Sequence, residues 1–332
     1  PERGRPPFGR VLTVLGDALT PSLVVEMAIH GHGLPHAWPQ EALEEASRVP
    51  LQGPAADAEG RVDLRSVPLV TIDGETAKDF DDAVWCEPNK GGFRLIVAIA
   101  DVSHYVRPGT SLDDEAAKRA TSVYFPGFVV PMLPETLSNG ICSLNPKVDR
   151  LCFACDMQID HDGVVQSSRF YEAVMRSHAR LTYTQAWAAI GEGDAAAIGQ
   201  VGSLMPQLER LHQLYRLLAR QRSARGAIEF DSQEIEFRLG PAGEVVQAEP
   251  TQRNDAPRLI EECMIAANVE AAKFLLRKAL PTPYRVHDRP PQSKYDELLE
   301  FLKEFGLKLP GWEKVAPRDF TALLKKVRKR PD

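Results

Sequence analysis

Four aspartates, Asp73, Asp79, Asp81 and Asp82, stand close together directly after the apolar run Val67–Val70. Two unit charges about 4 Å apart repel by on the order of 4 kcal/mol at an effective dielectric of roughly 20, so the cluster requires a cation or a bound proton. Hard oxygen ligands without nearby Cys or His favour Mg²⁺ or Mn²⁺ over zinc. The segment therefore predicts a site for metal-assisted phosphodiester chemistry at the end of a strand.

The same cluster has a second interpretation as a solvated turn, because Asp and Gly both favour turn conformations. An EF-hand calcium loop does not fit, since that loop needs acidic residues at alternating positions and a glutamate at the twelfth. The steps of six, two and one residues from Asp73 to Asp82 do not match this pattern. On spacing alone the metal site is favoured, and the turn stays open.

The composition is that of an ordinary globular protein, with 332 residues, 43% of them hydrophobic and 26% charged, which indicates about two domains. No apolar run approaches the roughly 18 residues of a membrane span, and the first residues lack the apolar core of a secretory signal. We therefore expect a cytoplasmic protein that does not contact a membrane. The net charge of −6 is no nucleic-acid footprint for the whole chain, although Lys325–Arg330 is basic.

Five cysteines lie in apolar segments: Cys86, Cys142, Cys152, Cys155 and Cys263. Cys152 and Cys155 have zinc-type spacing, but they lie in a predicted strand, where side chains three positions apart point to opposite faces. We therefore expect buried thiols in a reducing cytosol.

The elements that must position the aspartates follow from hydrophobic periodicity and turn residues, and their order predicts an α+β fold. The predicted strands are 8–16, 67–73, 93–106, 151–160 and 164–177, with short strands at 227–231, 234–239 and 244–250. The predicted helices begin at Thr20-Pro21 and span about 40–47, 203–224, 257–279 and 292–305.

Eight sequence blocks, in order along the chain, carry a resemblance to a known family. They are residues 70–74, 79–83, 98–106, 121–127, 130–134, 225–230, 259–268 and 284–288. Together they resemble the RNB catalytic domain of the ribonuclease II/ribonuclease R family of exoribonucleases, and more closely its ribonuclease R branch. The resemblance implies a mixed β-sheet packed with helices over 63–332, a linker at 36–62, and the tail of a small cold-shock or OB-type barrel at 1–35.

The resemblance implies a processive 3′→5′ exoribonuclease that hydrolyses single-stranded RNA from its 3′ end to nucleoside 5′-monophosphates, using Mg²⁺ or Mn²⁺. It assigns Asp73 and Asp82 as direct metal ligands, Asp81 as the indispensable carboxylate, and Asp79 as a residue acting partly through water. It also implies a monomer.

Four further residues receive an RNA-binding role from the resemblance. Tyr124 matches a tyrosine that stacks on the 3′-terminal bases, and Phe230 matches the second aromatic of that clamp. From the sequence alone, packing of either aromatic in a core stays open. One of Glu261 and Glu262 is expected to face the RNA channel, with an ordinary solvated glutamate as the alternative.

In the family the catalytic domain continues beyond the position that matches Asp332, into an arginine-rich segment that grips the terminal phosphates and then an OB barrel. We therefore expect a sequence truncated at both ends. Two other hypotheses stay open: an RNA-binding module that holds a 3′ end without cutting it, and an unrelated metal-dependent phosphohydrolase that acts on small phosphate esters.

Overall fold

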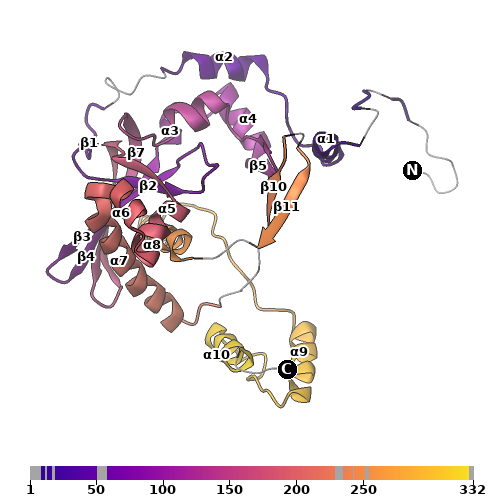
Figure 1. Cartoon of the computed structure of the whole chain (residues 1–332). Coiled ribbons are helices and arrows are strands. Elements are labelled where there is room, and N and C mark those ends of the chain that lie inside the picture. The colour runs from indigo at the N-terminus through magenta and orange to yellow at the C-terminus, as the bar shows by residue number, and fades with distance from the viewer. Residues whose placement is uncertain are drawn as a thin grey trace. The chain divides into compact units, whose positions relative to one another are not determined.

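The computed structural model describes residues 9–11, 13–16, 19–50, 58–228, 235–241, 243–250 and 254–328. The chain divides into two compact units. The first unit takes its residues from 1–51, 102–140 and 233–252, and the second from 52–101, 141–232 and 253–332 (Figure 1). Strands and helices occur in both units, so the predicted α+β class is confirmed.

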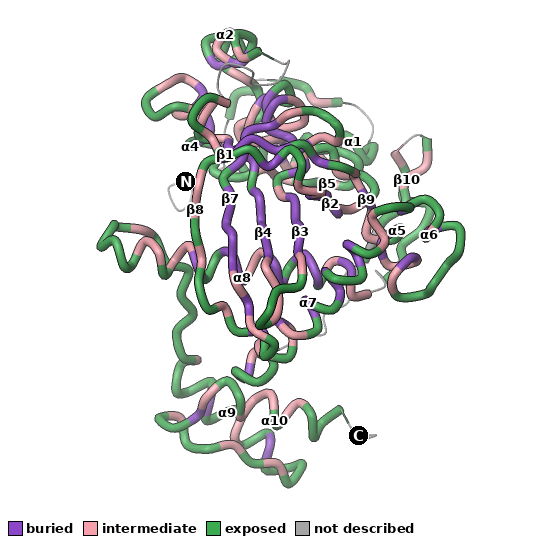
Figure 2. The backbone as a smooth tube through the Cα atoms, turned by 90° about the vertical axis from the view of Figure 1, so that its left-hand side faces the viewer, coloured by how far each residue is buried: buried purple, intermediate pink, exposed green. Residues whose placement is uncertain are grey.

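A mixed sheet of seven described strands is the framework of the second unit, in the order β1-β8-β7-β4-β3-β2-β9. The strands are β1 Val62–Asp63, β2 Val70–Asp73, β3 Asp82–Asn89, β4 Gly92–Ala100, β7 Asp149–Asp160, β8 Val165–Arg176 and β9 Ala179–Thr182. The pairs β1–β8 and β2–β9 are parallel, and the other neighbours are antiparallel. Figure 2 shows buried residues running along β7, β4 and β3 at the centre of this sheet.

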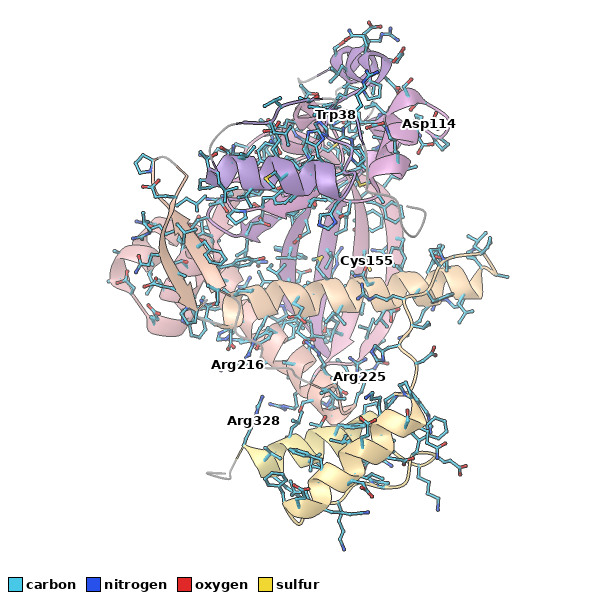
Figure 3. The ribbon with its side chains drawn as sticks, turned by 90° about the vertical axis from the view of Figure 1, so that its right-hand side faces the viewer. Trp38, Asp114, Cys155, Arg216, Arg225 and Arg328 are labelled. Atoms are coloured by element: carbon cyan, nitrogen blue, oxygen red, sulfur yellow. The ribbon has the colours of Figure 1, made fainter. Side chains whose placement is uncertain are left out.

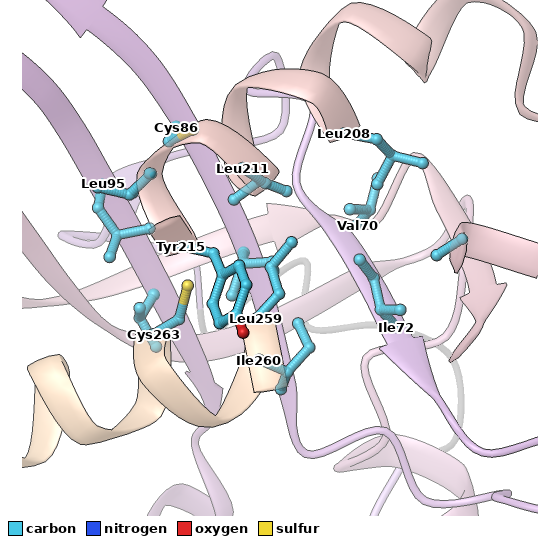
Figure 4. Packing of buried hydrophobic residues seen from close by; sticks show 14 of the residues in the cluster. Val70, Ile72, Cys86, Leu95, Leu208, Leu211, Tyr215, Leu259, Ile260 and Cys263 are labelled. Carbon is cyan, nitrogen blue, oxygen red and sulfur yellow. The ribbon is translucent and has the colours of Figure 1, made fainter. Parts of the chain in front are cut away.

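Two long helices, α7 (Met205–Ala224) and α8 (Asp255–Arg277), cover one face of the sheet. Leu211 of α7 and Leu259 of α8 are fully buried against sheet residues such as Leu95 (Figure 4). Burying each such side chain contributes about 1.5–3 kcal/mol. Figure 3 shows α8 lying across the strands. The predicted helices at 203–224 and 257–279 are thus confirmed to within two residues at each end.

The remaining elements of the second unit are short helices and turns around this core. They are α5 Tyr183–Trp187, α6 Ala195–Val201, α9 Gln292–Glu304, α10 Pro317–Val327, and the helical turns Ala188–Glu192 and Gly202–Leu204. No helix of the described residues is long and apolar enough to cross a membrane.

The first unit contains four helices and two β-hairpins among its described residues. The helices are α1 Pro21–Gly31, α2 Gln40–Arg48, α3 Val102–Tyr105 and α4 Ser111–Arg119. A helical turn, Thr136–Ile141, lies where the chain passes from the first unit to the second. The hairpins are β5 Val123–Phe125 with β6 Phe128–Val130, and β10 Ile235–Leu239 with β11 Val245–Pro250. The Thr20 hydroxyl accepts a hydrogen bond from the Leu23 amide at 3.2 Å, which confirms the predicted helix start.

Arg119 contacts several separate segments of the first unit. Its guanidinium donates to Glu115 at 2.9 Å and lies 3.5 Å from the ring centre of Trp38, which Figure 3 labels. It also donates to the carbonyls of Ala37 and Pro131, each at 2.9 Å. A buried charge with this many partners is satisfied rather than reactive.

Three strand predictions differ from the structure. The strand predicted over 93–106 is confirmed as β4 up to Ala100 and is wrong beyond it, where α3 begins at Val102. The described residues within 8–16 contain no strand. Ala227 and Ile228 are not in a strand either, and positions 229–231 lie outside the described residues.

All five cysteines are buried and unbridged. Burial raises the pKa of Cys86, Cys142, Cys152 and Cys155 to about 12, and that of Cys263 well above its ordinary value. The prediction of buried thiols is confirmed.

Candidate active site

The four aspartates lie where β2 ends and β3 begins. Asp73 is the last residue of β2 and Asp82 is the first of β3. These strands are antiparallel neighbours, so the last residue of β2 and the first residue of β3 lie at the same end of the strand pair. The loop 74–81 between them carries Asp79 and Asp81. The topology therefore places the four aspartates at, or in the loop between, the adjacent ends of two paired strands.

The carboxylates act on one another's protonation. Burial, assisted by the charges of Asp81 and Asp79, raises the pKa of Asp73 to about 6 against the opposing charge of Arg180. Burial and the charges of Asp73 and Asp81 raise the pKa of Asp82 to about 7. Burial of the carboxyl group and the charge of Asp79 raise the pKa of Asp81, although Asp81 as a residue is exposed. In each case burial is the larger cause, and the neighbouring carboxylates add to it.

The residues present fit a divalent cation. Oδ2 of Asp73 is buried and has no hydrogen-bond partner among the described residues. Leaving a buried acceptor unsatisfied costs about 1–3 kcal/mol, and a cation would remove that penalty. In the described ranges no three Asp, Glu, His or Cys side chains converge on one point as a metal cage.

Ser143 fixes one side of the aspartate loop. Its buried hydroxyl accepts from the Phe80 amide at 2.9 Å and donates to the Lys78 carbonyl at 3.3 Å. The Leu144 amide donates to the Phe80 carbonyl at 2.8 Å. The backbone on both sides of Asp79 is therefore held by the segment that precedes β7.

Ser143→Ala is expected to lower the free energy of unfolding by about 1–3 kcal/mol, because it leaves the buried Phe80 amide without its acceptor. Urea denaturation measures this difference. Ser167→Ala, at an exposed position of β8, is the matched control and should change stability by less than about 0.5 kcal/mol. Equal stability of the two variants would contradict a role for Ser143 in holding the loop.

Two residues beside the aspartates carry no signal in the sequence. Arg180 of β9 donates to the Gly74 carbonyl at 2.9 Å. Tyr183 follows β9, and burial together with the charges of Asp73 and Asp82 raises its pKa to about 12. Both reach the site because β9 pairs in parallel with β2, which a local pattern does not reveal.

The predicted RNA-binding residues lie in different surroundings. Tyr124 is on the β5–β6 hairpin of the first unit and is 67% exposed, so it is not packed in a core. Glu261 and Glu262 of α8 both accept from Nη1 of Arg222, at 3.0 and 2.8 Å. Glu262 is only 5% exposed, whereas the Glu261 side chain is half exposed. Phe230 lies outside the described residues.

Residues 61–332 match the RNB domain family, and residues 1–39 match the cold shock domain family. Ribonuclease R of Escherichia coli (strain K12) is 49% identical over 333 residues, covering 100% of this chain and 41% of the relative. Ribonuclease R of Aquifex aeolicus (strain VF5) is 38% identical over 333 residues, covering 100% of this chain and 47% of the relative. The chain thus spans less than half the length of these curated relatives.

Solved structures show the same fold. Mycoplasma genitalium RNase R in complex with ribose methylated single-stranded RNA superposes with a TM-score of 0.88 at 28% identity, over 96% of this chain and 49% of that one. The structure of yeast Ssd1, a pseudonuclease, superposes with a TM-score of 0.71 at 18% identity, over 96% of this chain and 38% of that one. The second likeness concerns the fold alone.

Proposed function

The chain belongs to the RNB domain family, and from this premise we propose that it is the catalytic part of a 3′→5′ exoribonuclease of the ribonuclease R type. The observation that carries the proposal is the cluster of four carboxylates at the β2–β3 edge, with its raised pKa values and the unpartnered oxygen of Asp73. The RNA complexes of a relative with this fold support RNA as the substrate.

Asp73 and Asp82 would hold Mg²⁺ or Mn²⁺ directly, because they project from two paired strands. When bound, the cation would neutralise phosphate charge and lower the pKa of an attacking water. Asp81, which is exposed, would supply the indispensable negative charge on the solvent side of the site. Asp79 would act through a bound water. Water then adds to the last phosphorus, the bond to the preceding 3′ oxygen breaks, and a nucleoside 5′-monophosphate leaves.

The remaining features of the proposal follow from the family. We propose that the protein acts processively on single-stranded 3′ ends as a cytoplasmic monomer, with Tyr124, Phe230 and one of Glu261 and Glu262 contacting the RNA. We propose the domain limits 1–35, 36–62 and 63–332 as drawn from the sequence.

Tyr124→Ala is expected to weaken binding of a short single-stranded RNA by about fivefold to 150-fold, because stacking on one base is worth about 1–3 kcal/mol. Fluorescence anisotropy with a labelled oligoadenylate in EDTA measures binding without cleavage. Phe301→Ala removes another exposed aromatic, on α9, and should leave affinity unchanged. Similar losses in both variants would count against a specific stacking role.

The direct test uses a single-stranded oligoribonucleotide labelled at its 5′ end, incubated with the chain and Mg²⁺. A ladder that shortens from the 3′ end is the expected result. RNA that is bound but not shortened would favour a non-catalytic RNA-binding module. Hydrolysis of a mononucleotide ester without hydrolysis of RNA would favour an unrelated phosphohydrolase.

A further inference from the structure

Arg180 contacts the start of the aspartate loop. It lies in β9, opposite Thr71 of β2 in the parallel register. Its Nη2 donates to the carbonyl of Gly74 at 2.9 Å and to that of Glu75 at 3.0 Å. These are the first two residues after Asp73, so the guanidinium fixes the direction in which the chain leaves β2.

Arg180 also reaches the end of the same loop. Its guanidinium carbon lies 5.5 Å from the ring centre of Phe80, within the range of a cation–π contact. Phe80 is buried and directly precedes Asp81. A single side chain therefore bridges the two ends of the segment that carries Asp79 and Asp81.

Arg180 does not pair with the Asp73 carboxylate. The two side chains form no ion pair within 4 Å among the described contacts. Nη2 of Arg180 is occupied by backbone carbonyls instead. Oδ2 of Asp73, which has no hydrogen-bond partner among the described residues, thus stays available to another cation.

We infer that Arg180 is a positioning residue of the active site, which holds the 74–81 loop in place before a metal binds. The inference rests on the proposed function for the role of the aspartates. Arg180 acts through the loop, because its Nη2 donates to the loop backbone and its guanidinium faces Phe80.

Arg180→Met keeps the apolar stem and removes both the donors and the charge. We expect faster hydrogen exchange at the amides of residues 74–81, and Mn²⁺ binding weakened by about 10–100-fold, the range typical for residues that orient metal ligands. Loss of a positive charge alone would strengthen cation binding, so weaker binding reports geometry. We expect kcat to fall by about 10–100-fold with KM for RNA unchanged, and Arg180→Lys to recover part of the loss.

The matched control is Arg94→Met. Arg94 donates twice to Asp156 and lies 5.7 Å from the Trp85 ring centre, but it pairs in register with Glu87, at the far end of β3 from Asp82. Its loss should leave exchange at 74–81 and Mn²⁺ affinity unchanged. Mn²⁺ is followed by electron paramagnetic resonance of the free ion in the full chain.

Unchanged loop exchange and unchanged or tighter Mn²⁺ binding in Arg180→Met would overturn the inference. Failure of the proposed function has a different signature, in which the wild-type chain neither binds Mn²⁺ nor shortens RNA. In that case the exchange of residues 74–81 in the metal-free protein still decides whether Arg180 holds the loop.

Discussion

Asp81→Asn is expected to slow the shortening of single-stranded RNA by about a thousandfold or more, which corresponds to about 4 kcal/mol of lost transition-state stabilisation. The amide keeps the shape of the carboxylate but removes one negative charge from the cluster that would hold the cation. The rate of 3′ shortening under single-turnover conditions, with Mg²⁺ in excess, measures the loss.

The melting temperature of Asp81→Asn distinguishes a loss of catalysis from unfolding of the variant. The charge of Asp81 raises the pKa values of Asp73 and Asp82, so its removal relieves repulsion in the metal-free protein and should not lower the melting temperature. RNA affinity in EDTA should also be preserved. Asp162→Asn, at an exposed position of the β7–β8 turn, is the control and should retain full activity. An Asp81→Asn protein with more than about a tenth of wild-type activity would contradict an essential role for this carboxylate.

Gly92→Ala is expected to lower the free energy of unfolding by about 2–4 kcal/mol, through backbone strain and overpacking together. Gly92 begins β4 with φ of 148°, and an added Cβ would lie 2.3 Å from the Ile159 carbonyl oxygen and 2.5 Å from the Asp160 carbonyl carbon. These are backbone atoms of the paired strand β7, so they cannot move aside without breaking the pairing of Gly92 with Asp160.

The neighbouring Gly91 supplies the control for this prediction. An added Cβ there meets nothing within 4 Å, so Gly91→Ala should change stability by less than about 1 kcal/mol. Urea unfolding of both variants gives the comparison. β4 pairs with β3, which begins at Asp82. A less stable Gly92→Ala protein should therefore also show reduced RNA hydrolysis at elevated temperature. Equal urea midpoints for the two variants would contradict the prediction and show that the backbone at Gly92 can adjust to a Cβ atom.

Local patterns in the sequence predict the parts of the molecule that depend on near neighbours. The aspartate cluster, the hairpin of β7 and β8, and helices α7 and α8 follow from spacing, turn residues and helical periodicity. The strand predicted through Val106 failed because the apolar alternation says nothing of Asp101, whose carboxylate pairs with Arg61 at 2.7 Å as the sheet ends.

The supports of the site could not be predicted in the same way. Arg180 and Ser143 read as ordinary residues until the fold brings them to the loop, from 106 and 63 positions away respectively. Their function depends on the β2–β9 pairing and on the turn before β7, which are long-range contacts. The pairing of Glu261 and Glu262 with Arg222 likewise requires the packing of α7 against α8, although each helix alone is predictable.

The separation between Gly74 and Arg180 also bears on how the protein is made. During synthesis the four aspartates leave the ribosome long before β9 does, and contacts between distant residues form late in folding because their loop-closure entropy must first be overcome. A nascent chain that stops short of Arg180 contains all four aspartates but lacks the guanidinium that contacts Gly74, Glu75 and Phe80. Closure of the 74–81 loop by Arg180 therefore has to wait until β9 has joined the sheet beside β2.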